Sequence, residues 1–350
     1  MSMAKKAKSE KQERWLDYFA LRRELRAEGP ARLYLLFGEE DYLREDFLRE
    51  LREACLPDGD DGFAYHRFDA AQPGMRAVEE AVNALPFTTE RTLVELRGFD
   101  LNRCRDSEGE ELVKIAEDIP DYCTVAIVLD AGYEPDMRLK TVKAVVKAAK
   151  AAKFSPQGQG QLVQWIQKRF SALGKRISPD ACTELVMTSG ELMGGLIPEI
   201  GKIAAGTAGD TVTAEDVRRL ASPIPEAQAF KIADSLAARD FDGAARLLSE
   251  LLASDMEPIA ALAAIGGNMR RLYAARVAID GGLGREFVEK LYNIRFRSIG
   301  DSLMNTARRL PREYLARAVE LCAETDYKMK SSPYGDRELL SELLIRLSTP

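Results

Sequence analysis

The stretch "YLLFGEEDYLRED", residues 34–46, has the outline of a nucleotide-binding site but not its chemistry. An apolar run reaches Gly38 and continues as an amphipathic pattern, which predicts a strand, a turn and a helix. A phosphate-binding loop has the pattern G-x-x-x-x-G-K-[ST], in which backbone N–H groups and a lysine meet the phosphates. This turn instead carries Glu39, Glu40 and Asp41. Carboxylates at the positive end of a helix dipole satisfy its free N–H groups and repel a triphosphate, so the stretch predicts a capped helix.

The first half of the chain alternates strand and helix patterns. Strands are predicted at 33–37, 64–68, 91–96, 123–129 and 152–154, and helices at 41–56, 72–85, 108–119 and 136–150. Such a series predicts a mostly parallel sheet covered by helices. From residue 160 to the C-terminus the pattern is helical, with a capping box at Thr213 and Asp216. The fold class is therefore α/β followed by all-α.

A charged helix is predicted at 12–28, ahead of the sheet. Gly29 and Pro30 end it, and one of its faces carries Trp15, Tyr18, Phe19 and Leu25. Such an apolar face packs either on the body of the protein or on a partner.

Composition limits the class of protein. The chain has 350 residues, of which 46% are hydrophobic and 30% charged, enough for two or three domains. We see no run near the roughly 20 apolar residues of a membrane span and no signal-peptide pattern, which predicts a cytoplasmic protein without a membrane partner. The five cysteines are scattered and never in CxxC spacing, which argues against disulfides and zinc. A net charge of −6 leaves room only for a local nucleic-acid surface.

The sequence contains few candidate catalytic residues. The single histidine, His66, lies in an alternating strand and has no motif around it, which favours a structural role. An ATPase of this topology also needs a carboxylate pair after a later strand, and Asp130 is followed by Ala131. We therefore predict no catalytic residue, no cofactor and no metal.

The order of motifs resembles a known family. "YLLFGEEDYLRED", "ALPFTTERTLVEL", "DMRLKTVKAVVK", "LVQWIQKRFSALGKRISPDACTEL" and "DYKMKSSPYGDRELLSELLIRL" follow one another between residues 32 and 347. As a series they resemble the delta subunit of the bacterial DNA polymerase III clamp loader. The resemblance implies an ATPase-like (AAA+-type) parallel-sheet domain without ATPase chemistry, a small helical lid and a C-terminal helical collar.

The domains and partners follow from that resemblance. The expected boundaries are an N-terminal helical extension at 1–30, the ATPase-like domain at 31–157, the lid at 158–223 and the collar at 224–350. The implied function in DNA replication is to bind and open the sliding clamp (beta subunit) so that it is loaded on primed DNA. The implied partners are gamma/tau and delta prime type subunits within the polymerase holoenzyme, a DNA-directed DNA polymerase and nucleotidyltransferase assembly of the nucleoid.

The corner "NALPFTTER" is the expected clamp-binding element. By pattern, the preceding helix places Met75, Val78, Val82 and Leu85 on its inner face, and Pro86 ends the helix. Pattern alone therefore predicts that Leu85 and Phe87 point into the core. The resemblance implies the opposite, because this corner matches the element in which adjacent apolar residues enter a pocket on the clamp. The resemblance thus assigns clamp binding to Leu85, Pro86 and Phe87.

Two further features are candidate DNA contacts. The predicted helix 136–150 carries a row of lysines that either meets successive phosphates or is merely solvated: Lys140, Lys143, Lys147 and Lys150. Tyr334, in the loop "SSPYGD", either stacks on an unpaired template base or packs down to close its loop.

Two alternatives to the clamp-binding function remain open at this point. One is an active AAA+-type ATPase with an atypical site, which ATP binding would reveal. The other is a helical adaptor outside replication, which would not bind the sliding clamp.

Overall fold

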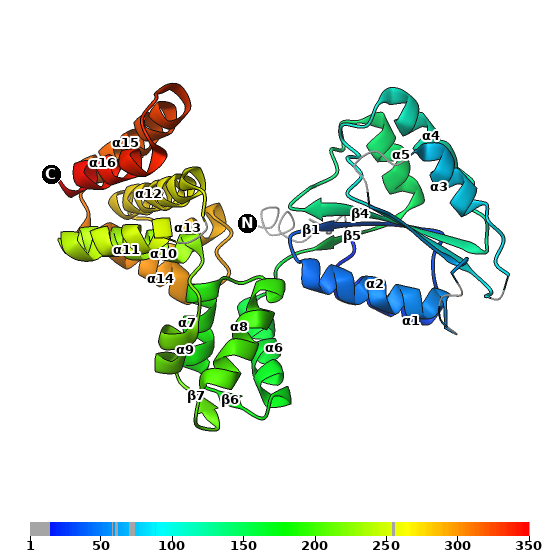
Figure 1. Ribbon diagram of the computed structural model, residues 1–350, viewed down its shortest axis with the longest axis horizontal. Coiled ribbons are helices and arrows are strands. Elements are labelled where there is room, and N and C mark those ends of the chain that lie inside the picture. The colour runs from blue at the N-terminus through cyan, green and yellow to red at the C-terminus, as the bar shows by residue number, and fades with distance from the viewer. Residues whose placement is uncertain are drawn as a thin grey trace, which may run out of the picture. The chain divides into compact units, whose positions relative to one another are not determined.

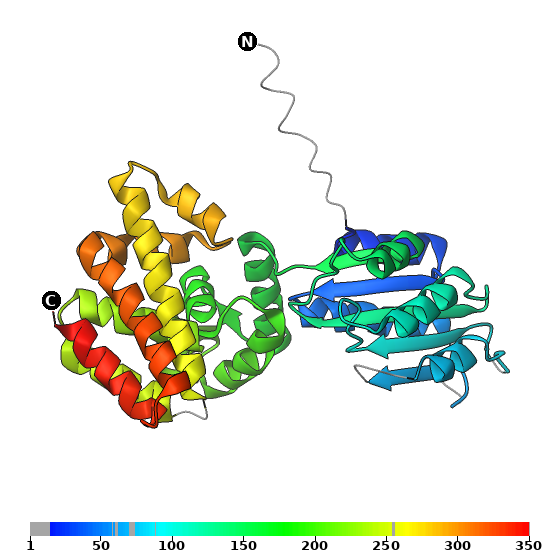
Figure 2. The same ribbon diagram turned by 90° about the horizontal axis from the view of Figure 1, so that it is seen from above.

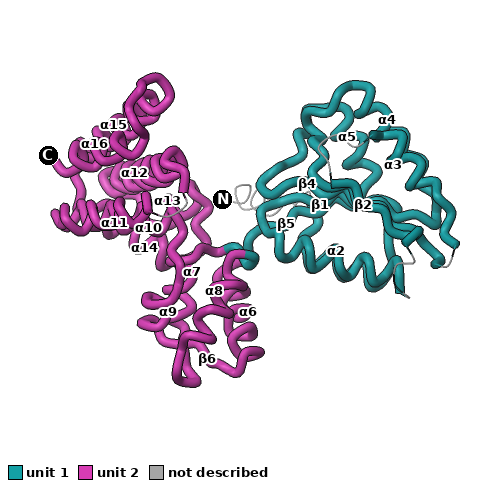
Figure 3. The backbone as a smooth tube through the Cα atoms, in the orientation of Figure 1, with its two compact units in different colours: residues 1–156, 192–194 teal, residues 157–191, 195–350 magenta. Residues whose placement is uncertain are grey.

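The computed structural model describes residues 15–57, 59, 62–69, 74–87, 89–253 and 256–349. The chain divides into two compact units (Figure 3). Unit 1 comprises residues 1–156 and 192–194, and unit 2 comprises residues 157–191 and 195–350. Each unit contains a large hydrophobic cluster of its own.

Unit 1 is built on a parallel five-stranded sheet, as the alternating pattern predicts. Its strands are β1 (Leu33–Gly38), β2 (Tyr65–Asp69), β3 (Thr92–Arg97), β4 (Cys123–Ala131) and β5 (Lys150–Phe154). They lie in the order β2-β3-β4-β1-β5, and every neighbouring pair is parallel, so their arrows point the same way in Figure 2. β1 is buried along its whole length, as expected of a strand covered on both faces.

Helices cover both faces of the sheet (Figure 1). On one face lies α2 (Asp41–Cys55), where Phe47 packs on Tyr34 with ring centroids 5.6 Å apart. On the other face lie α3 (Met75–Val82), α4 (Asp106–Glu117) and α5 (Lys140–Ala148). Alternate β1 residues, Leu33, Leu35 and Phe37, belong to the cluster beneath these three helices. The α/β fold class of the first half is thus confirmed.

The N-terminal helix packs on unit 1. α1 (Tyr18–Glu28) is joined to α2 by the Tyr18 hydroxyl, which donates to Asp46, and by an Arg22–Glu50 ion pair. Just before it, the Leu16 N–H donates to the Ala151 carbonyl at 3.1 Å, which extends pairing beyond the edge strand β5. Of the two expected locations, the body of the protein is therefore the observed one. The predicted helix residues 12–14 lie outside the described residues.

Several boundaries and faces differ from the prediction. α3 ends at Val82, so Leu85 is not on its inner face and Pro86 is not what ends it. α5 ends at Ala148, and Lys150 begins β5 instead of continuing the helix. Phe19 does not share the buried face of Tyr18 and Leu25, contrary to the pattern, because it is 53% exposed while those two are buried. Residues 72 and 73 of the predicted third-helix range lie outside the described residues.

Unit 2 is almost entirely helical. Its first part contains α6 (Gln159–Ala172), α7 (Pro179–Ser189), most of α8 (Met193–Gly206) and α9 (Ala214–Leu220). A small parallel pair that the helical pattern did not predict joins β6 (Arg176–Ile177) to β7 (Thr211–Val212). The predicted capping box of Thr213 and Asp216 is present at the start of α9.

The rest of unit 2 is a helical array around one hydrophobic cluster, which runs from Ala229 to Leu347. Its members are α10 (Pro225–Ala237), α11 (Phe241–Ala253), α12 (Pro258–Asp280), α13 (Arg285–Leu291), α14 (Arg297–Arg309), α15 (Arg312–Ser331) and α16 (Asp336–Ser348). The division into a lid at 158–223 and a collar at 224–350 remains our proposal. In the described part of the chain, we find no helix with both the length and the apolar character needed to cross a membrane.

Gly38 provides a test of the close contact between the end of β1 and the end of β5. Its φ is +123°, and a Cβ at this position would come within 2.8 Å of Phe154 backbone atoms. Gly38→Ala should therefore cost more than the roughly 1–3 kcal/mol of backbone strain alone and lower the melting temperature by several degrees. The matched control is Gly29→Ala, because Gly29 has φ +78° and open space around its Cβ position. Equal melting temperatures for the two variants would contradict a tight contact at Gly38.

Candidate functional sites

The turn after β1 lies directly against the end of β5. The Glu40 N–H donates to the Phe154 carbonyl at 3.0 Å, and Gly38 pairs with Phe154 across the sheet. Because only a residue without a Cβ fits this approach, the turn is held closed by backbone contacts. A phosphate-binding loop needs the opposite, an open cradle of N–H groups facing the ligand.

Glu40 is fully buried in this turn. Its carboxylate accepts the Met193 N–H at 3.2 Å, at the start of α8, within the segment that clusters with unit 1. As the residue before α2, Glu40 makes no capping bond through its side chain. The prediction that its carboxylate satisfies the N–H groups of α2 is therefore wrong.

Arg44 fills the space beside the turn. It donates from Nη1 to the Gly38 carbonyl at 3.1 Å and pairs with Asp41 one turn earlier in the helix. Its side chain is only 8% exposed. The pattern analysis did not single out Arg44. The available signal was the i,i+3 spacing of Asp41 and Arg44 at the helix start.

A shallow hollow of about 400 Å³ lies at the carboxyl ends of β2, β3 and β4. Its lining includes Arg44, Arg67, Arg97 and, at the end of β4, the exposed Asp130. The three arginines have carboxylate partners: Asp41 for Arg44, Asp69 for Arg67, and both Glu45 and Glu95 for Arg97. Their charge is therefore largely neutralised.

Burial and ion pairing have opposite effects on the pKa values in this hollow. Desolvation by burial lowers the pKa of Arg97, but hydrogen bonds and charges from Glu45 and Glu95 outweigh it and raise that pKa. For Glu45, burial raises the pKa, yet the hydrogen bond from Arg97 brings it below its ordinary value. Both partners thus stay charged at neutral pH. Glu95 is itself fully buried and also accepts from Arg52 Nε at 2.6 Å, so the network ties α2 to β3.

Other candidates for chemistry lie apart from this hollow. His66 is half-buried in β2, in keeping with its predicted place in a strand. Across the described ranges, no cluster of three or more His, Cys, Asp or Glu side chains is placed to hold a metal ion.

The corner after α3 is exposed. Leu85 is 65% exposed and Phe87 is 84% exposed, while Pro86 between them is half-buried. The Tyr122 hydroxyl donates to the Asn83 carbonyl at 3.3 Å, which anchors the start of the corner. The pattern-based prediction that Leu85 and Phe87 point into the core is therefore wrong. Two large apolar side chains stand next to each other in solvent, which is the usual mark of a contact surface.

The lysine row is shorter than predicted. Lys140, Lys143 and Lys147 lie exposed on α5. Lys150 is in β5 instead, where its ammonium group pairs with Glu24 at 2.9 Å and Glu28 at 2.7 Å. Lys150 therefore does not continue the helical stripe, because the helix ends before it and its charge is used to hold α1. Whether the other three lysines contact DNA stays a prediction.

Tyr334 lies between α15 and α16 and is 70% exposed. The interpretation in which it packs down to close its loop is therefore wrong. The ring is accessible, and stacking on a base stays a prediction.

Comparison with known proteins identifies the family. The family model "DNA polymerase III, delta subunit" matches residues 34–155. The model "DNA polymerase III delta subunit, C-terminal domain" matches residues 226–347. The chain belongs to the DNA polymerase III delta subunit family. The resemblance found in the sequence is thereby confirmed.

Two relatives of this delta family member match it over most of their own length. "DNA polymerase III subunit delta" of Bacillus subtilis (strain 168) is 23% identical over 320 residues, which cover 89% of this chain and 91% of the relative. "Probable DNA polymerase III subunit delta" of Aquifex aeolicus (strain VF5) is 22% identical over 252 residues, 70% of this chain and 71% of the relative.

One solved structure is similar over nearly the whole delta family chain. The Bacillus subtilis DNA clamp loader delta protein has a TM-score of 0.55 and 21% identity, covering 95% of this chain and 100% of the other. This similarity shows the fold. The expected parallel-sheet domain followed by a helical region is therefore confirmed.

The exposed corner predicts a small effect of mutation on stability. Leu85→Ala with Phe87→Ala should change the free energy of unfolding by no more than about 0.5 kcal/mol per site, since both side chains are largely in solvent. Leu112→Ala is the matched core control, because Leu112 is 1% exposed on the buried side of α4 and the loss of its side chain should cost about 2–5 kcal/mol. Thermal unfolding followed by circular dichroism compares them. If the corner variant loses as much stability as Leu112→Ala, the prediction is contradicted and Leu85 and Phe87 are packed in the core.

Proposed function

We propose that this chain is the clamp-loader subunit that binds the sliding clamp (beta subunit) and opens one of its interfaces. In this role it acts with gamma/tau and delta prime type subunits, in the cytoplasm, to load the clamp on primed DNA. Family membership supports the assignment. The observation that carries it is the exposed pair Leu85 and Phe87 at the corner after α3.

The corner has the properties of a compact binding hot spot. A Leu and a Phe contribute about 1.5–3 kcal/mol each when they are fully buried in a partner's pocket. Pro86 restricts the backbone between them, which lowers the entropy lost on binding. The Tyr122–Asn83 hydrogen bond holds the base of the corner against the sheet domain. The side chains thus face solvent from a supported backbone.

Clamp capture tests the role of the corner. With the cognate sliding clamp immobilised, Leu85→Ala with Phe87→Ala should weaken binding at least tenfold, because both apolar anchors are lost. The variant should still join the other loader subunits, since it leaves unit 2 unchanged. Phe63→Ala is a matched control, because Phe63 is another exposed phenylalanine of unit 1, 66% accessible. Normal clamp binding by the double variant would refute the assignment.

We further propose that the chain neither binds nor hydrolyses ATP by itself. The closed turn at Gly38, the buried Glu40 and the Arg44 side chain occupy the region where a phosphate cradle would be needed. The arginines beside it already have carboxylate partners. The subunit would therefore depend on ATP-hydrolysing partners.

Isothermal titration of the purified chain with Mg-ATP should give no saturable heat in the micromolar range. A loader subunit that carries the G-x-x-x-x-G-K-[ST] pattern serves as the positive control. Saturable binding, or phosphate release by the isolated chain, would instead favour an atypical ATPase.

The remaining contacts of the proposed loader follow from the exposed residues. The helices from 224 onward form the proposed collar, which carries the contacts with other subunits. Lys140, Lys143 and Lys147 are suited to the phosphates of primed DNA, and Tyr334 to an unpaired template base.

A further inference from the structure

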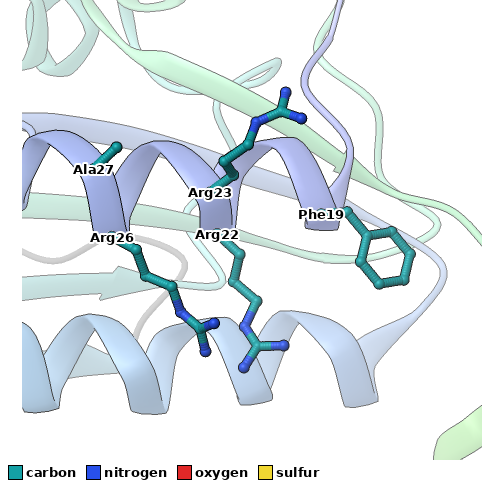
Figure 4. Close-up of a pocket in the computed structure, with 5 residues that line it drawn as sticks. All are labelled: Phe19, Arg22, Arg23, Arg26 and Ala27. Carbon is teal, nitrogen blue, oxygen red and sulfur yellow. The ribbon is translucent and has the colours of Figure 1, made fainter.

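The outer face of α1 is an exposed surface that the proposed clamp and collar contacts do not involve. Phe19 lies there, 53% exposed, while Leu21 and Leu25 on the opposite side are buried. A hollow of about 430 Å³ on this face is lined by five residues at helical spacing: Phe19, Arg22, Arg23, Arg26 and Ala27 (Figure 4). The helix thus buries Leu21 and Leu25 against unit 1 and leaves Phe19, Arg23 and Arg26 exposed, while Arg22, 29% exposed, turns toward α2.

The charges on this face do not cancel. Arg22 donates from Nε to Glu50 at 2.7 Å, and Arg26 reaches the same carboxylate at 3.2 Å, so two guanidinium groups share one negative charge. Among the described residues, Arg23 has neither a hydrogen bond nor an ion pair. Figure 4 shows Arg22 and Arg26 directed toward α2, and Arg23 leaving the helix on the other side. Arg26 itself keeps 67% of its side chain exposed. The face therefore keeps an excess of positive charge.

The sequence just before α1 is basic as well. Residues 1–14 contain five lysine or arginine residues (Lys5, Lys6, Lys8, Lys11 and Arg14) and two glutamates, Glu10 and Glu13. The chain as a whole has a net charge of −6. Positive charge is thus concentrated at this end of an acidic protein, which favours a polyanionic partner.

We propose that the outer face of α1 binds a single-stranded nucleic acid, with Phe19 stacking on a base while Arg23 and Arg26 contact phosphates. Proteins that bind single strands combine an aromatic platform with positive charge along the backbone path. An acidic peptide shares only the charge and does not use a planar ring in this way. A duplex satisfies the arginines but keeps its bases stacked away from Phe19. The proposal uses different residues from the clamp-binding corner and does not depend on it.

The test uses the full-length chain and a fluorescein-labelled oligodeoxythymidylate of about 20 nucleotides, followed by anisotropy at several salt concentrations. Arg23→Ala with Arg26→Ala should weaken binding about tenfold and reduce the slope against log salt by about 1.4, at roughly 0.7 per phosphate contact. Phe19→Ala should weaken binding at least fivefold with little change in that slope. Phe19→Tyr should bind about as tightly as the unchanged chain, because the tyrosine ring can also stack on a base. The control is Arg76→Ala, an arginine with 91% side-chain exposure on α3.

The same binding measurements in a variant that also carries Lys140→Ala, Lys143→Ala and Lys147→Ala distinguish binding by α1 from binding by the lysines of α5. Loss of binding on changing α1 in that background supports the proposal, provided that circular dichroism shows each variant to be folded. Oligonucleotide binding that is equal for the α1 variants and for Arg76→Ala overturns it. The proposal is also overturned if the arginine variants weaken oligonucleotide binding but Phe19→Ala does not, since the face would then contact phosphates alone. Binding of an acidic peptide through the same arginines, with no binding of the oligonucleotide, assigns the face to a protein partner and also overturns the proposal.

Discussion

The architecture of unit 1 depends on the close backbone contact between the turn after β1 and the end of β5. At Gly38 the chain approaches Phe154 so closely that a Cβ has no room, and Glu40 in the same turn donates its N–H to the Phe154 carbonyl. This contact directs the chain into α2 and brings Arg44 back over the Gly38 carbonyl. The region that a phosphate-binding loop leaves open is therefore filled by the protein's own groups.

The acids of the turn have separate structural roles. Asp41 pairs with Arg44 inside α2, whereas the buried Glu40 accepts an N–H from the start of α8, far along the chain. A buried carboxylate needs such partners, because burial without them strongly disfavours its charged form. The acidic turn thus stabilises the fold through contacts that are local for one residue and long-range for the other.

The edge strand β5 explains much of the remaining arrangement. On its open side it pairs with the residues that lead into α1, and Lys150 at its start pairs with Glu24 and Glu28 of that helix. An uncovered parallel edge would expose unpaired backbone groups. α1 is held in place by these contacts, and its outer face is left to carry Phe19 and the arginines.

Sequence patterns alone determined the parallel α/β series, the helical second half and the absence of a phosphate-loop motif, because these depend on period, composition and short motifs. Through the family resemblance, the order of motifs also singled out residues 85–87 as the expected clamp-binding corner. Only the tertiary structure decided that both side chains are exposed: the periodicity of α3 continues through Leu85, but the helix ends at Val82. The same holds for Lys150, whose spacing fits α5 although its backbone is in β5. The ties of Glu40 to Met193 and of Glu95 to Arg52 also join residues far apart in the chain. Helical spacing is a local property, whereas the residue at which a helix ends and the partner a charge finds are set by packing between distant segments.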